Sequence, residues 1–226
     1  MRVLTVLAVL ALVASLVFAY VSSKRPPDVP LEHGSGASSE VGSAQTIALA
    51  GPAPYEVYAT SQLDDWRAYT NANDSSLGHI TTHVVTYVAA ADADSVAVAF
   101  RGRIDQTGEV RNDTHLDHFP RKGLTLDAFL AHADWTVFDI SVRDEARTVN
   151  GHTFHCKKLE YNEGDPMFPN KRTHVEYWLS PEVPAGGLVE KHETQDLDSL
   201  HFDMHMVVIG YGTGSGTTWG TRPDGL

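Results

Sequence analysis

The sequence predicts a mainly β fold, a curved antiparallel sheet with one short helix, following an N-terminal hydrophobic helix. Three observations support this fold class. Most segments after residue 55 alternate apolar and polar residues with a period of two, as strands with one buried face do. The Asn150-Gly151 dipeptide indicates a tight hairpin, because both positions of a type I′ turn need positive φ. Only one segment of the domain has a convincing helical period, so an antiparallel meander is favoured over alternating strands and helices.

The clearest strand is Ser95–Ile104, in which Val96 and Val98 face one way while Arg101 and Arg103 face the other. The same alternation predicts strands at Trp66–Thr70, His79–Ala90, Trp135–Arg143, Ala146–Val149, His152–Tyr161, Arg172–Leu179, Leu188–Thr194 and Leu200–Ile209. Each strand has one apolar face, so we expect a single curved sheet with one covered side.

The predicted helix is Leu124–Ala133. Thr125 can cap its first turn, and Leu126, Phe129 and Leu130 fall on one side of it. This side is the candidate for covering the apolar face of the sheet.

The chain begins with an apolar leader, residues 1–21. Val3 to Val21 contains no charged residue and, as a helix, is about 28 Å long, close to the thickness of the hydrocarbon core. A core helix of a cytoplasmic domain would carry a polar stripe, and this segment has none. It is therefore a signal peptide that is cleaved, or a signal anchor that is retained. We expect an exported protein, either membrane-anchored and facing the periplasm or the extracellular side, or secreted.

Composition divides the remaining chain into three parts. Residues 22–54 are rich in Pro, Gly, Ser and Ala and predict a flexible linker. Residues 55–211 form the β-rich domain. Residues 212–226 predict a disordered tail, because they consist mostly of Gly and Thr.

Charge and cysteine content exclude several classes of function. The formal net charge of −12 argues against a nucleic-acid partner and against electrostatic docking on anionic lipid. Cys156 is the single cysteine, so an intramolecular disulfide and a zinc site built from several thiolates are impossible. Because Phe154 and Cys156 share a strand face, we expect the thiol to be buried.

Four segments carry a resemblance to known proteins: Asp65-Trp66, Pro120–Leu126, Asn150–Lys158 and Tyr177–Val189. They resemble a group of uncharacterised exported bacterial proteins, similar in layout to the half-barrel of periplasmic lipoprotein carriers. The resemblance covers about residues 60–209 and implies a half-barrel-like sheet. It implies no chemistry, so a carrier function rests on architecture alone.

The candidate metal ligands are His201, Asp203, His205 and His192. On a strand the first three share a face, with neighbours nearly 7 Å apart. One metal ion cannot easily bridge all three, but two of them with His192 from the preceding strand could bind one. The alternative is a solvated polar face, which has the same pattern without a metal. His174 and Glu176 can lie one strand further along.

No motif predicts catalysis. The sequence lacks a nucleophile elbow, a phosphate loop and a zinc-protease helix. A Cys–His pair would need Cys156 beside a histidine, and His155 points away from it on a strand. The expected function is therefore that of a non-catalytic envelope domain without a cofactor, which binds an apolar ligand or an envelope protein or has a structural role. A divalent-metal-binding domain is the first alternative, and a hydrolase-type enzyme the second.

Overall fold

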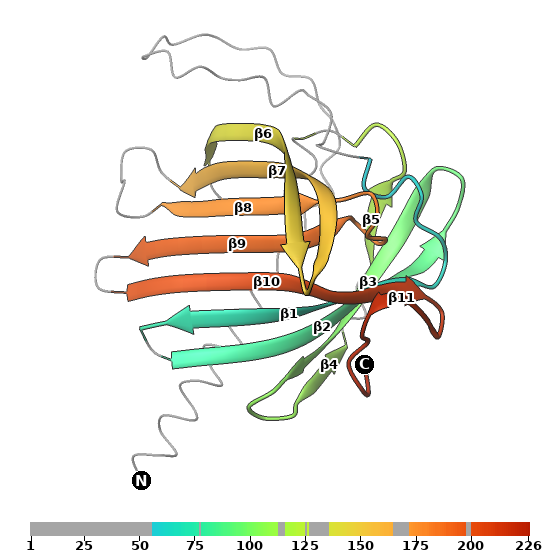
Figure 1. The fold of residues 1–226 in the computed structure, drawn as a ribbon, viewed down its shortest axis with the longest axis horizontal. Helices are drawn as coiled ribbons and strands as arrows, with labels where there is room; N and C mark the ends of the chain where they lie inside the picture. Colours follow the sequence, from blue (N-terminus) through green and yellow to red (C-terminus); the bar gives the residue numbers. More distant parts are fainter. Residues whose placement is uncertain are drawn as a thin grey trace, which may run out of the picture. The chain divides into compact units, whose positions relative to one another are not determined.

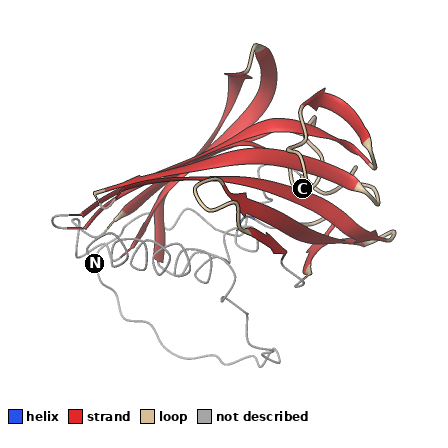
Figure 2. Ribbon diagram, turned by 90° about the horizontal axis from the view of Figure 1, so that it is seen from below, coloured by secondary structure: helices blue, strands red, loops and turns tan. Residues whose placement is uncertain are grey.

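The computed structural model describes residues 56–76, 78–112, 116–124, 126, 136–164, 172–197 and 200–226. These residues form an antiparallel sheet that is open and curved, which confirms the predicted fold class (Figures 1 and 2). Its strands are β1 (Asp65–Ser75), β2 (Gly78–Ala91), β3 (Ser95–Ile104), β4 (Val110–Asn112), β5 (Asp117–Pro120), β6 (Thr136–Val149), β7 (His152–Gly164), β8 (Thr173–Leu179), β9 (Leu188–Leu197), β10 (Leu200–Thr213) and β11 (Gly216–Gly220).

The strand order is β4-β3-β2-β1-β10-β9-β8-β7-β6, with β5 on β3 and β11 on β10. Paired strands are therefore neighbours in sequence with two exceptions: β5 pairs with β3, and β1 pairs with β10 and joins the two halves of the sheet. In the Asn150-Gly151 turn between β6 and β7 the φ angles are 48° and 80°, which confirms the predicted hairpin.

Parts of the sequence prediction lie outside the described residues. These are the leader, the linker up to residue 55, and all of the predicted helix Leu124–Ala133 except Leu124 and Leu126, which are both buried. In the described part of the chain, no helix is long and apolar enough to cross a membrane.

The prediction of a disordered tail at 212–226 is wrong. β10 continues to Thr213, and β11 pairs back onto it. Trp219 packs against Phe154 with a ring-centroid distance of 5.3 Å, and Leu226 is buried beside Trp66. Burial of Leu226 and partial burial of Trp219 against the sheet offset the entropy of ordering a Gly- and Thr-rich segment. Glycine is required in this hairpin, because a Cβ at Gly220 would collide with the backbone of β10.

The two faces of the sheet differ in chemistry. Residues opposite one another on paired strands share a face, so Glu176, His192 and His205 lie on one side. We call this side the polar face. Tyr177 and Met206 lie on the other side and pack against a buried apolar cluster that includes Val57, Tyr58, Val88, Leu179 and Leu188. The candidate site is therefore a feature of the polar face.

Candidate functional site

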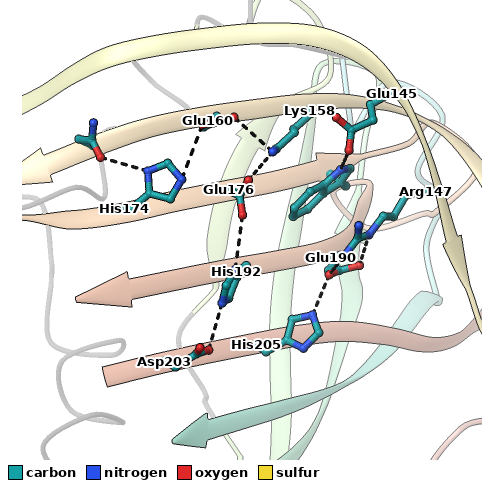
Figure 3. A network of polar contacts seen from close by, with 12 residues as sticks. Glu145, Arg147, Lys158, Glu160, His174, Glu176, Glu190, His192, Asp203 and His205 are labelled. Atoms are coloured by element: carbon teal, nitrogen blue, oxygen red, sulfur yellow. Dashed lines mark hydrogen bonds and ion pairs between the residues drawn. The ribbon is translucent and has the colours of Figure 1, made fainter. Parts of the chain in front are cut away.

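A charged network crosses the polar face from β6 to β10 (Figure 3). Alternation on each strand places two polar side chains of the network on the same face, and pairing brings the strands into line. The network consists of Glu145, Arg147, Lys158, Glu160, His174, Glu176, Glu190, His192, Asp203 and His205.

Lys158 is at the centre of the first half of the network. Its side chain is only 8% exposed, and its ammonium group is ion-paired with Glu176 and lies 3.2 Å from Glu160 Oε2. Burial lowers the pKa of Lys158, but the hydrogen bonds to Glu176 and Glu160 outweigh it and the pKa is raised. Arg143 donates to Glu160 at 3.0 Å, and this bond holds the pKa of Glu160 below its usual value. His174 Nε2 lies 3.7 Å from Glu160 Oε1.

His192 lies between the two halves, with polar contacts to Glu176 and Asp203 and a ring contact to His205. Its Nδ1 lies 3.4 Å from Glu176 Oε2, and its Nε2 lies 3.1 Å from Asp203 Oδ1. His205 lies directly opposite His192 on β10, with the ring centroids 5.6 Å apart. These contacts give a continuous chain of imidazoles and carboxylates across three strands.

Glu190 is the buried anion of the second half, with a side chain 4% exposed. Both nitrogens of one edge of the Arg147 guanidinium donate to its two oxygens, and His205 Nε2 lies 2.7 Å from Glu190 Oε1. Burial raises the pKa of Glu190, but the bonds to Arg147 and His205 outweigh it, so the pKa lies below its usual value. Glu190 is thus held as a carboxylate by two partners.

The Arg147–Glu190 pair also fixes the course of the β6–β7 hairpin. In the strand order β6 is three strands away from β9, yet the two side chains form a bidentate pair. The hairpin therefore arches over the polar face, as Figure 1 shows. Trp178 Nε1 donates to Glu145 at 2.7 Å, and the Arg147 guanidinium lies 4.4 Å from the Trp178 ring centre, which adds a cation–π contact.

Acid is expected to destabilise the domain through these carboxylates. Glu145, Glu160 and Glu190 all have pKa values below the ordinary 4.5. A lowered folded-state pKa contributes stability that is present above pH 4.5 and is lost as the pH falls through the folded value. Urea unfolding at a series of pH values from about 6 down to about 3 measures the effect. The free energy of unfolding should fall more steeply with pH for wild type than for Glu190→Gln. Equal slopes would contradict a role for Glu190, and Glu56→Gln, at an exposed position, is the control.

The structure brings together some of the predicted metal ligands and separates others. His192, Asp203 and His205 meet in the network. His201 pairs instead with Asp196 at 2.7 Å, and the hydrogen bond to Asp196 raises the pKa of His201. Metal binding by the predicted set stays a prediction.

A different set has the geometry of a metal site. Among the described residues, Glu160, His174 and Glu176 form the one group with three ligand atoms all within 4.8 Å of one another. Two carboxylates and an imidazole can bind a divalent transition metal such as zinc. The sequence pattern indicated His174 and Glu176 only as neighbours of another site and gave no reason to select Glu160. Its role depends on the register of β7 against β8, in which Glu160 lies opposite Glu176.

Cys156 is buried as predicted, with 2% of its surface exposed. Desolvation raises the pKa of the thiol to about 12. A reactive cysteine needs a thiolate near neutral pH, so this environment disfavours Cys156 as a nucleophile.

The surface of the described residues includes the following two hollows. One, of about 350 Å³, is lined by Asp144, Glu145, Ala146, His155 and Cys156. The other, of about 320 Å³, is lined by Val85, Tyr87, Arg101, Arg222 and Leu226. Charged side chains line both, so these two hollows favour ligands with polar groups. Binding of an apolar ligand under the predicted helix stays a prediction.

No family model and no curated protein matches the sequence. A structure from Bacteroides fragilis, described as an exported protein with a YmcC-like fold, matches with 14% identity over 68% of this chain and 97% of its own, at a TM-score of 0.42. A lipoprotein from Parabacteroides distasonis matches with 12% identity over 69% and 99%, at 0.40. A DUF1329 family protein from Desulfovibrio piger matches with 9% identity over 70% and 88%, at 0.22.

Two of these three proteins are described as exported or as a lipoprotein. The specific likeness to the half-barrel of lipoprotein carriers stays a prediction.

Proposed function

We propose that this chain is an exported, non-catalytic domain of the cell envelope that binds a divalent metal ion on the polar face of its sheet. The observation that carries the proposal is the convergence of Glu160, His174 and Glu176 within 4.8 Å. The uncharged leader Val3 to Val21 supports export. The buried, protonated thiol of Cys156 supports a binding role over nucleophilic catalysis.

The three ligands come from adjacent strands and are partly buried. Glu160 is on β7, and His174 and Glu176 are on β8, all three at intermediate exposure. His174 Nδ1 lies 3.1 Å from Asn162 Oδ1, which orients the imidazole and leaves Nε2 toward Glu160. An outer hydrogen bond of this kind is what fixes the ring of a metal-binding histidine.

Lys158 competes with the metal for the two carboxylates. Its ammonium group already pairs with Glu160 and Glu176, so a metal ion must displace it. Removal of the ammonium leaves two carboxylates close together without a balancing cation. The affinity for a divalent metal is therefore set by this lysine.

Zinc titration by calorimetry on the full chain tests the proposal. Wild type is expected to bind about one zinc ion, as a three-ligand site predicts. His174→Ala should abolish binding, whereas Lys158→Met should tighten it about ten-fold or more, because the competing cation is gone. His79→Ala is the matched control, since this half-exposed histidine pairs with Asp74 outside the network.

Three outcomes would reject the metal proposal: no binding by wild type, equal affinity of His174→Ala and wild type, or equal losses in His174→Ala and His79→Ala. Lys158→Met also has a readout on folding. Without metal it should melt below wild type, and excess zinc should raise its melting temperature more than that of wild type. An unchanged melting temperature in zinc would contradict binding at this position.

A further inference from the structure

The hollow of about 320 Å³ lies where the C-terminal segment packs on β2 and β3, outside the strands β6 to β10 that carry the charged network. Val85 and Tyr87 of β2 and Arg101 of β3 line it from the sheet, and Arg222 and Leu226 line it from the C-terminal segment. Its volume is at the lower end of the range for small-molecule sites. Two arginine residues therefore line one small cavity.

Arg101 has an unsatisfied donor. Its Nε is buried and has no hydrogen-bond partner among the described residues. Arg222 uses its Nε for the main-chain oxygen of Leu226 at 2.9 Å and its Nη1 for that of Gly214 at 3.2 Å, and its guanidinium lies 5.3 Å from the Trp66 ring centre. These three contacts hold Arg222 in place at the rim. Arg222 is thus held by protein groups, whereas Arg101 lines the same hollow with an Nε that has no partner among the described residues.

A buried guanidinium donor without an acceptor is costly, and an oxyanion is the acceptor that restores the balance. Guanidinium groups bind carboxylates and phosphates through paired N–H donors. The nearby Arg103 is turned to other partners, donating to the main-chain oxygen of Asp224 at 2.8 Å. The concentration of arginine is local, since the chain as a whole carries a net charge of −12.

We propose that this hollow is a binding site for an oxyanion, the phosphate or carboxylate group of a small ligand, with Arg101 as the principal contact. Arg222 supplies the second positive charge. Val85, Tyr87 and Leu226 give the remainder of the ligand an apolar surface. The site is independent of the metal site, because no residue is shared between them.

Calorimetric titration of the full chain with inorganic phosphate and with acetate, at constant ionic strength, tests this inference. Arg101→Met keeps the length of the side chain and should weaken binding of at least one of the two anions about ten-fold or more. Arg111→Met is the control, because Arg111 is on the adjacent strand β4 opposite Gly102, and so on the other face from Arg101. Equal affinities of Arg101→Met and wild type, equal losses in both variants, or no binding by wild type would each overturn the proposal.

Stability gives a second readout that does not depend on finding the natural ligand. In anion-free buffer Arg101→Met should melt at or above the temperature of wild type, since the unsatisfied buried donor is gone. Saturating phosphate or acetate should raise the melting temperature of wild type and not that of the variant. A large drop for Arg101→Met in anion-free buffer would mean that Arg101 has a purely structural role and would also overturn the proposal.

An experiment with lipid vesicles distinguishes two sources of the oxyanion, a lipid headgroup and a soluble anion. If vesicles of phosphatidylglycerol bind wild type, and phosphate competes while Arg101→Met abolishes both, the ligand group is a lipid phosphate. If phosphate binds through Arg101 and the vesicles do not, the ligand is a soluble anion. Both results support the oxyanion site, whereas vesicle binding that Arg101→Met does not alter counts against it.

Discussion

Replacing Arg147 with alanine is expected to destabilise the domain by about 3 kcal/mol. The variant leaves Glu190 as a buried carboxylate, 4% exposed, with His205 as its remaining partner. It also removes the cation–π contact with Trp178 and frees the arch of the β6–β7 hairpin. The figure is at the low end for breaking a buried pair, because the Arg147 side chain is 36% exposed. Urea unfolding at neutral pH measures the effect.

Two further variants show whether the loss of stability comes from leaving the buried Glu190 carboxylate without Arg147. Arg143→Ala breaks pairs in which both partners are more than one quarter exposed, so its expected cost is much smaller than that of Arg147→Ala. The double variant Arg147→Met, Glu190→Leu removes both buried charges and should recover most of the loss. Equal losses of stability for Arg147→Ala and Arg143→Ala would show that the Arg147–Glu190 pair between β6 and β9 contributes little to the free energy of unfolding.

Phe154→Ala should cost about 3–5 kcal/mol, the range for truncating a buried aromatic side chain. Phe154 has no exposed surface and contacts Trp219 of β11 edge-to-face, with Tyr211 of β10 nearby. The resulting cavity would lie between the β6–β7 hairpin and the C-terminal strand, so both elements lose packing. Chemical unfolding gives the overall loss, and hydrogen exchange should show the largest increase in β11.

Val142→Ala on β6 is the matched control, since Val142 is 45% exposed and its truncation should change stability by less than about 0.5 kcal/mol. If Phe154→Ala left exchange in β11 unchanged, the packing of the C-terminal strand on the hairpin would not contribute to its order.

Local sequence patterns predicted most of the strands because the causes are local. Alternation in Ser95–Ile104 matches the bounds of β3, and Asn150-Gly151 adopts the positive φ angles that its composition favours. The error at residues 212–226 has a non-local cause. Trp219 packs against residues of β7 and β10, and Leu226 packs against residues of β1. These contacts form only in the folded sheet, so the local sequence around residues 212–226 does not predict them.

The candidate site was predicted in part for a similar reason. Alternation correctly places His201, Asp203 and His205 on one strand face, but it does not determine which residues of other strands lie opposite. The pairing of Glu160 with Glu176, and the crossing of Arg147 to Glu190, follow from register and from the arch of a hairpin. The spacing of these residues in the sequence predicts neither contact.

The anomalous scattering of crystals soaked in zinc tests the central claim most directly. One strong peak is expected on the polar face about 2.0–2.2 Å from His174 Nε2 and from one oxygen each of Glu160 and Glu176, with the Lys158 ammonium displaced. Absence of a peak at these three residues, in crystals that diffract well with saturating zinc, would contradict it.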